Sequence, residues 1–304
     1  MLESLRRRWR KDGALLGMTL PGLVYLVLFA YVPMFGLVIA FKNYNYSTGL
    51  WNSPWVGFKN FDFLFASQDA WRITYNTLFL NFLFIFFGTI ASIGFALLLN
   101  EIRIKVLSRF VQSTMLLPHL LSWVIVGYFV YALLTYNGLV NNILGYFGIE
   151  AIEWYNSPEY WPAILTITAI WKMLGYNSVI YLASILGISS DYYEAAVIDG
   201  AGKMQQIRYI TLPLLSPIII ILVLLSIGKI FYADFGLFYN VTRDMGMLYS
   251  TTDVIDTYVF RMLRTVGDVG MSSAAGFYQS IVGLILIVTA NFVVRKIDRE
   301  QSLF

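Results

Sequence analysis

Long apolar runs separated by short polar stretches dominate the pattern of this chain. A helix needs about 20 mostly apolar residues to cross a bilayer, and six runs reach that length. They cover approximately residues 14–41, 73–99, 111–135, 161–187, 213–236 and 274–294. Charged residues lie mostly between these runs. The pattern therefore predicts an all-α membrane protein with six transmembrane helices.

Composition supports the same class. Of the 304 residues, 58% are hydrophobic and only 13% are charged, and the mean hydropathy is +0.67. Such a chain has too little polar surface for a soluble domain. The absence of cysteine excludes disulfides, thiolate metal sites and cysteine nucleophiles. The single histidine, His119, is too isolated for a metal site or a catalytic pair.

The first residues are basic and precede the first apolar run. Five Lys and Arg residues lie between Arg6 and Lys11. The apolar run that follows is longer than a signal-peptide core and lacks a small-residue cleavage site, so it is predicted to be a retained span. Leu2 and Trp9 suggest that residues 1–13 lie as a short interfacial helix against the lipid headgroups.

The domain organisation is expected to be simple. No low-complexity linker, charged tail or clear internal repeat divides the chain, so residues 14–295 are predicted to form one membrane domain. A tail over residues 296–304 follows it. The domain includes a polar loop at 189–213 and an amphipathic stretch at 250–267.

Lys and Arg residues are distributed unevenly between alternate loops. Thirteen lie in the N-terminus, residues 100–110, residues 188–212 and the C-terminus, whereas six lie in the longer loops of the other side. Basic loops are preferentially retained in the cytoplasm. Both termini and the 189–213 loop are therefore predicted to be cytoplasmic.

The 189–213 loop is a polar island between the fourth and fifth apolar runs. A helix is expected over residues 191–198, because Ser189, Ser190 and Asp191 can cap its start by accepting backbone N–H bonds. Gly200 permits the positive φ that ends such a helix. A second short helix, over about 203–211, is expected to lead into the next span at Pro213, which suits a first helical turn.

The island also carries the pattern Glu-Ala-Ala, three residues, Gly, nine residues, Ile-x-Leu-Pro. On this pattern the chain resembles the permease subunits of ATP-binding-cassette (ABC) importers, whose cytoplasmic coupling loop has that signature. The matching positions are Glu194, Ala195, Ala196, Gly200, Ile210, Leu212 and Pro213. The resemblance implies an ATPase-coupling group made of Glu194, Ala195, Ala196, Asp199 and Gly200. A plain connecting loop is the alternative.

The resemblance implies a type I ABC importer permease fold with a cytoplasmic coupling helix, in a bacterial cell membrane. The implied partners are a second related permease, two cytoplasmic ABC ATPases and an extracellular or periplasmic sugar-binding protein. ATP and Mg²⁺ would bind the ATPases, since this chain has Val197 and Met204 where a phosphate loop needs Gly and Ser or Thr. This chain itself is expected to be no enzyme and to bind no cofactor, metal or nucleic acid.

The outer amphipathic stretch bears on the cargo. Residues 250–267 have apolar positions at helical spacing, Ser250 and Asp253 as possible caps, and Gly267 as a stop. They predict a helix on the outer face, either near the substrate entrance or simply packed on the bundle. The run 248–259 also resembles the branch of these permeases that imports complex oligosaccharides and polysaccharide fragments.

Ionisable residues inside the apolar runs indicate a substrate path. Lys172 lies near the middle of the fourth run, and Lys229 and Asp234 lie in the outer half of the fifth. A charge in hydrocarbon is costly, so such residues normally face a bundle interior or a wet cavity. Neighbouring aromatic and amide side chains suit sugar rings and hydroxyls. The predicted path comprises Trp171, Lys172, Tyr176, Asn177, Lys229, Phe231 and Asp234.

Two accounts of these charges remain open. In one, Asp234 neutralises a lysine and the aromatic side chains serve as packing or interfacial anchors. In the other, Lys172 and Lys229 contact the substrate, and an acidic oligosaccharide would offset their desolvation better than a neutral one. The second account makes acidic oligosaccharides the preferred cargo.

Two other classes of protein are weighed against the importer. An ion-gradient-driven secondary sugar transporter would be expected to show an inverted repeat and a buried carboxylate chain for coupling ions, and neither is visible in the sequence. A membrane anchor subunit of an enzyme would need a set of cofactor ligands, which is also missing. The sequence therefore favours the permease of an oligosaccharide importer.

Overall fold

The computed structural model describes residues 13, 15, 17–62 and 68–297. Among these residues, six helical stretches are long and apolar enough to cross a membrane, which confirms the predicted fold class. They are Gly17–Phe41, Gln68–Glu101, Trp123–Tyr146, Pro158–Leu186, Lys203–Ile227 and Val269–Lys296. The interfacial helix expected over residues 1–13 and most of the tail at 296–304 lie outside the described residues.

The chain divides into two compact units. The first comprises residues 1–66 and 262–278. Its first span ends in α2 (Val32–Met34) and the 3₁₀ segment η2 (Phe35–Phe41), and α3 (Gly49–Asn52) follows. A small core of this unit packs Ala40 and Phe61 against Ala274.

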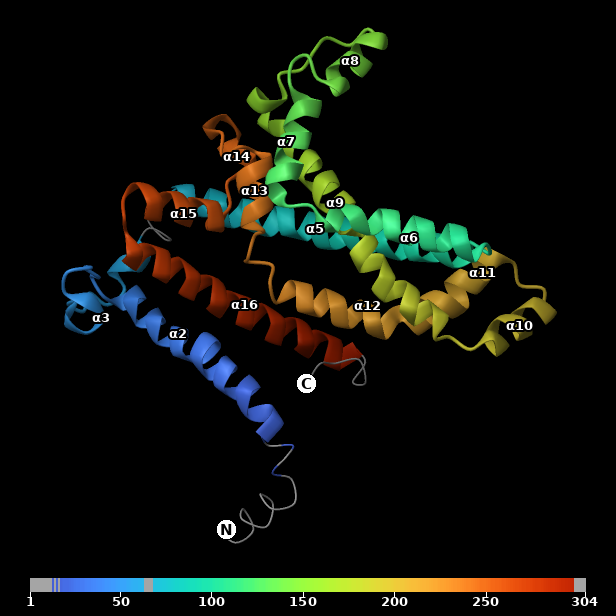
Figure 1. Ribbon diagram of the computed structural model, residues 1–304, viewed down its shortest axis with the longest axis horizontal. Helices are drawn as coiled ribbons and strands as arrows, with labels where there is room; N and C mark the ends of the chain where they lie inside the picture. The colour runs from blue at the N-terminus through green and yellow to red at the C-terminus, as the bar shows by residue number, and fades with distance from the viewer. Residues whose placement is uncertain (1–12, 14, 16, 63–67, 298–304) are drawn as a thin grey trace. The chain divides into compact units, whose positions relative to one another are not determined.

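The second unit comprises residues 67–261 and 279–304, and it contains all the predicted site residues. Helices α15 and α16 each belong partly to both units. The helices of the second unit are α5 (Gln68–Glu101), α6 (Lys105–Leu120), α7 (Trp123–Leu134), α8 (Leu139–Tyr146), α9 (Trp161–Leu186), α10 (Ser190–Ile198), α11 (Lys203–Gln206), α12 (Leu212–Ile227), α13 (Phe235–Val241), α14 (Tyr249–Thr252), α15 (Ile255–Thr265) and α16 (Val269–Ile297) (Figure 1).

Helix α9 is central to the second unit, because it packs on both α5 and α6. Near one end, Ala96 and Leu99 of α5 meet Tyr181, Leu182 and Ile185 of α9 in a buried cluster. Against α6 the approach is closer still. A Cβ on Gly175 of α9 would collide with the Met115 backbone carbonyl. Only glycine permits this contact between the two helices.

The third predicted span is not one helix. We expected a single helix over residues 111–135, but α6 ends at Leu120 and α7 begins at Trp123, with extended backbone at Leu121 and Ser122. The physical reason lies in Pro118 near the end of α6, which provides no N–H to the helical ladder. Ser122 then starts a new helix, because its Oγ accepts the N–H of Ile125 at 3.3 Å.

The fifth predicted span is also shorter than expected. Helix α12 ends at Ile227, and α13 starts only after Asp234. The prediction that Lys229 and Asp234 lie on the fifth transmembrane helix is therefore wrong. Asp234 begins α13 instead, since its Oδ1 accepts the N–H groups of Gly236 and Leu237 at 3.0 and 3.3 Å.

Lys172 links the break in the third span to α9. Its ammonium donates to the backbone carbonyls of Pro118, His119 and Leu121, at 3.1, 2.9 and 2.5 Å. It also lies 5.0 Å from the ring centroid of Trp123. The side chain is buried, with 6% of the residue exposed. Lys172 therefore donates to two carbonyls of the last turn of α6 and to the Leu121 carbonyl that follows it, where the helical N–H groups end.

Trp123 extends this chain of contacts to the break in the fifth span. Its indole N–H donates to Oδ2 of Asp234 at 2.8 Å, while Oδ1 of Asp234 caps α13. The structure thus favours a structural role for Lys172. Its partners are backbone carbonyls and an aromatic face, not the carboxylate that the sequence analysis had considered.

The amphipathic helix predicted over 250–267 begins later than expected. The stretch expected to be helical over 250–267 contains the short α14 and then α15, which starts at Ile255. Asp253 is fully buried and forms an ion pair of 2.6 Å with Arg261. Gly267 ends the helix as predicted, with a φ of +75°.

The Lys172 contacts generate a stability prediction. Lys172→Met should lower the unfolding midpoint of the detergent-solubilised protein, because buried carbonyls lose their donor at a cost of about 1–3 kcal/mol. Lys229→Met is the matched control. The Lys229 side chain is exposed and has no hydrogen bond or ion pair within the described part of the chain. Equal midpoints for the two variants, measured by thermal unfolding, would contradict the capping role.

Candidate functional site

The polar island folds into the capped helix that the sequence predicted. Ser189 Oγ accepts the N–H of Asp191 at 3.3 Å and starts α10. The helix ends at a turn in which Gly200 has a φ of +81°. Across this turn the Ala201 N–H donates to the Ala196 carbonyl at 2.8 Å. Glycine at the left-handed position completes this helix C-terminus.

The loop is joined firmly to the rest of its unit. The expected second short helix is instead the start of the fifth span, which is continuous over Lys203–Ile227. The hydroxyls of Tyr193 and Thr211 share a hydrogen bond of 3.0 Å, which connects α10 to that span. The ammonium of Lys203 lies 3.1 Å from Oε1 of Glu101, at the end of α5. These two contacts fix the loop against the neighbouring helices.

The predicted coupling residues lie on the surface of this loop. Glu194, Ala195, Asp199 and Gly200 are exposed, and Ala196 is half-buried. Large apolar side chains beside them are also exposed, with Ile198 reaching 86%. Within the second unit, α10 lies at the end opposite α13 and α14 (Figure 1). Contiguous exposed apolar and charged groups of this kind are typical of a protein-binding surface.

An open cavity of about 640 Å³ lies among α5, α9, α12 and the segment between α12 and α13. The break after Ile227 contributes several of its lining groups. Aliphatic side chains make up much of the wall. The polar groups that line it include Asn81, Tyr176, Asn177, Lys229, Tyr232 and Asp234.

Four of the seven residues of the predicted substrate path line this one cavity. They are Tyr176, Asn177, Lys229 and Asp234. The structure brings them together from α9 and from the segment that follows α12. Asp234 is held by three donors, whereas the Lys229 ammonium is exposed and has no hydrogen bond or ion pair within the described part of the chain.

The other three predicted residues lie elsewhere. Lys172 is turned toward the end of α6, as described above. Trp171 stacks on Phe129, with ring centroids 6.2 Å apart. Phe231 is buried, and its backbone carbonyl accepts a hydrogen bond of 2.7 Å from Nε2 of Gln279. None of these three side chains is among those that line the cavity.

Trp123 and Asn81 are among the lining residues that the sequence analysis missed. Trp123 reaches the cavity from the start of α7, and Asn81 reaches it from α5. Asn81 Nδ2 donates to the Ile230 and Tyr232 carbonyls, at 2.8 and 3.3 Å. These carbonyls belong to the non-helical segment after α12. An asparagine inside the second apolar run was the available signal, because it needs a polar partner there.

His119 packs against a cavity residue. Its ring stacks on that of Tyr176, with centroids 4.6 Å apart and planes inclined by 13°. Its Nδ1 lies 3.3 Å from the sulfur of Met173. These contacts pack His119 of α6 against α9 and orient the Tyr176 ring at the cavity wall.

The sequence matches a known protein family and is similar to several known proteins along most of its length. Residues 85–299 match the family described as "Binding-protein-dependent transport system inner membrane component". The chain is 36% identical over 292 residues to Protein LplB of Bacillus subtilis (strain 168), covering 96% of this chain and 91% of that protein. It is 37% identical over 284 residues to the polygalacturonan/rhamnogalacturonan transport system permease protein YteP of the same organism, covering 93% and 88%.

Solved structures with the same fold are available for comparison. One is a bacterial ABC transporter involved in the import of the acidic polysaccharide alginate, with a TM-score of 0.88 at 34% identity, covering 97% of this chain and 99% of that chain. Another is a bacterial alginate ABC transporter in complex with an alginate pentasaccharide-bound periplasmic protein, with a TM-score of 0.86 at 34% identity. It covers 96% of this chain and 97% of the solved one.

The family match and the whole-chain similarity agree with the coupling signature and with the six helical spans. They favour an ABC-type permease over an ion-gradient-driven carrier. The chain belongs to the family of binding-protein-dependent transport system inner membrane components, the multi-pass permease subunits of ABC importers.

Proposed function

We propose that this permease forms half of the translocation path of an ATP-driven importer of acidic oligosaccharides. The observation that carries the proposal is the polar cavity of the second unit, in which Lys229 is the cation without a protein partner among the described residues. The names of the relatives support the cargo class. YteP is named for polygalacturonan and rhamnogalacturonan, and both solved neighbours are alginate transporters.

The charges of the cavity favour an anionic ligand. The Asp234 carboxylate already accepts bonds from the Trp123 indole and from two backbone N–H groups of α13. These donors engage both carboxylate oxygens, so fewer of the lone pairs of Asp234 remain for a ligand. Lys229 keeps its three N–H donors available. A sugar carboxylate beside Lys229 would gain a charge-assisted hydrogen bond in a partly dry site.

The remaining lining suits sugar units. A volume of about 640 Å³ lies within the usual range of about 300–1,000 Å³ for small-ligand sites. Tyr176 and Tyr232 offer flat faces and hydroxyl groups, and Asn177 offers an amide. We infer that the cavity holds part of an oligosaccharide, and that the second permease completes its wall.

The coupling loop is proposed to dock one of two cytoplasmic ABC ATPases, which bind ATP and Mg²⁺. Ala195 and Ala196 leave a low surface that can enter a groove, and Glu194 can pair with a basic side chain of the partner. A sugar-binding protein is proposed to deliver the cargo on the outer side. Both termini are proposed to be cytoplasmic, from the positive-inside bias of the loops.

The coupling proposal predicts a loss of ATPase stimulation. In the assembled transporter, Gly200→Trp should abolish substrate-stimulated ATP hydrolysis, because bulk at the exposed turn obstructs docking. Gly148→Trp is the matched control. Gly148 also has a positive φ, +72°, and also has open space around its Cα, but it lies in an outer loop. Full stimulated activity in Gly200→Trp, measured by phosphate release, would refute the docking role.

The orientation can be tested with single cysteines, since the chain contains none. A membrane-impermeant thiol reagent should label Tyr146→Cys in intact cells and leave Met204→Cys unlabelled. Both parent residues are well exposed, at 91% and 75%, and neither replacement changes the charge bias of the loops. After permeabilisation both variants should react. Labelling of only Met204→Cys in intact cells would reverse the proposed topology.

The cargo proposal predicts a selective defect for a Lys229 variant. Lys229→Gln should reduce uptake of acidic oligosaccharides by about tenfold, the equivalent of one hydrogen bond to a charged group. Uptake of neutral oligosaccharides of equal length should change little, and Lys229→Arg should retain acidic uptake. Radiolabelled uptake of both sugars, measured in the same proteoliposomes, decides the matter. An equal loss for both sugars would rule out selection by charge at Lys229.

A further inference from the structure

We propose that a second pocket, between α7 and the turn after α13, is an outer subsite that binds the carboxylate of an acidic sugar unit through Arg243. The pocket has a volume of about 210 Å³ and is lined by Val124, Gly127, Tyr128, Tyr239, Asn240 and Arg243. The inference rests on the proposed function for the class of ligand. It assigns to that ligand a contact outside the cavity already described.

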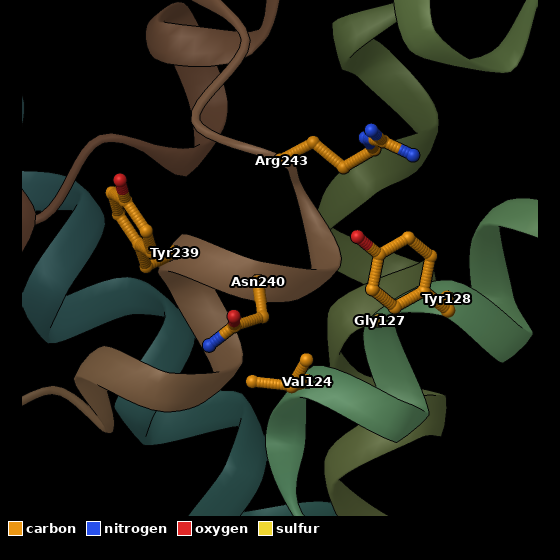
Figure 2. A pocket seen from close by; sticks show the side chains of 6 residues that line it. All are labelled: Val124, Gly127, Tyr128, Tyr239, Asn240 and Arg243. Carbon is orange, nitrogen blue, oxygen red and sulfur yellow. The ribbon is translucent and has the colours of Figure 1, made fainter.

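The guanidinium of Arg243 is positioned over aromatic rings and is open to a ligand. It lies 4.2 Å from the ring centroid of Tyr131 and 5.7 Å from that of Tyr128. No hydrogen bond or ion pair to its guanidinium occurs within the described part of the chain. Figure 2 shows Arg243 reaching from its turn toward Tyr128 of α7, with Asn240 and Val124 nearby. An arginine fork can bind a carboxylate through two parallel hydrogen bonds.

The backbone at this position is strained. Arg243 and Asp244 have φ angles of 58° and 49°, and they are the non-glycine residues with positive φ among the described residues. Side chains with a Cβ seldom adopt this region. Such strain persists only where the surroundings impose it, and it concentrates at ligand-binding positions. The turn directs the Arg243 side chain away from the core and toward the pocket.

A network behind the turn imposes this conformation. Oδ1 of Asp244 accepts hydrogen bonds from Nη1 of Arg261 and from the hydroxyl of Tyr249, each at 3.0 Å. The Asp244 N–H donates to Oγ1 of Thr242 at 3.2 Å. Burial raises the pKa of Tyr249 to about 12, although Arg261 opposes the shift, so its hydroxyl remains a donor at neutral pH. These contacts fix Asp244 and leave Arg243 to point outward.

A second carboxylate holds Arg261 in place. Asp253 is fully buried and accepts Nη2 of Arg261 at 2.6 Å. Burial alone would lower the pKa of Arg261, but the hydrogen bond and charge of Asp253 raise it above its usual value. Arg261 is therefore fully engaged with protein acids. Of the two arginines at this turn, Arg243 is the one left for an external anion.

The pocket lies along the same helices as the cavity. Trp123 lines the cavity and Gly127 lines the pocket, one turn further along α7, which is a rise of about 6 Å. On the facing helix α13, the N-cap residue Asp234 lines the cavity and Asn240 lines the pocket. An oligosaccharide that occupies the cavity can therefore extend toward the pocket with its next units.

The size and lining favour one sugar unit over a larger partner. A volume of about 210 Å³ is below the usual range of about 300–1,000 Å³ for whole small ligands, so it suits part of a longer chain. The exposed ring of Tyr128 and the half-buried ring of Tyr239 provide flat surfaces for a pyranose face. An acidic side chain of a binding protein is the competing occupant, and the experiment below distinguishes it.

The experiment measures uptake as a function of length in the assembled transporter. Arg243→Gln should raise the half-saturating concentration of an acidic tetrasaccharide by about tenfold. An acidic disaccharide, which is held within the inner cavity, and a neutral tetrasaccharide should be unaffected. Arg243→Gly relieves the backbone strain and removes the same guanidinium, so it should show the same defect. Arg264→Gln, elsewhere on the outer side, is the control for a general loss of positive charge.

Several outcomes overturn the subsite. One is an unchanged half-saturating concentration for the acidic tetrasaccharide in both Arg243 variants. Another is a weaker affinity of the binding protein for the transporter, irrespective of its sugar, which would assign Arg243 to a protein carboxylate. The proposed function fails separately, if the wild-type transporter does not take up acidic sugars or if Lys229→Gln leaves acidic uptake unchanged.

Discussion

The ammonium of Lys172, bound to three backbone carbonyls, is the interaction on which the site depends. In a bilayer there is no water to satisfy backbone groups released where a helix breaks. Lys172 donates to the carbonyls at the end of α6, and Asp234 accepts N–H groups at the start of α13. Trp123 contacts both side chains. Two predicted apolar runs can therefore be interrupted at neighbouring positions, and the segment at the second interruption lines the cavity.

This constraint separates structural charges from charges that are available to a ligand. Lys172 and Lys229 look alike in the sequence, since each is a lysine in an apolar run. Lys172 is buried against carbonyls, whereas Lys229 is exposed in the cavity. Arg261 and Arg243 differ in the same way, because Arg261 is paired with two carboxylates and Arg243 lies over tyrosine rings. In each pair, one cation is already bound to protein groups, so the other is the candidate for binding a ligand.

Much of the fold could be predicted because it depends on local signals. The length of each apolar run located the spans, and the Ser189 cap with Gly200 located α10. The breaks at Leu121 and after Ile227 were not predicted, since hydrophobicity continues through them while the groups that satisfy the broken backbone lie far away in the sequence. Lys172 is more than fifty residues from the carbonyls it caps. The left-handed turn at Arg243 carried no glycine to reveal it.

The continuity of one helix relates the two ends of the proposed mechanism. Residues Lys203–Ile227 form a single span, about 37 Å long at 1.5 Å per residue. One end begins beside the coupling loop and is tied to α10 by the Tyr193–Thr211 hydrogen bond. The other end leads directly into Lys229 and the cavity wall. A displacement of α10 by an ATPase would therefore act on the cavity through one continuous helical span, which ends at Ile227 and leads into the non-helical segment at the cavity wall.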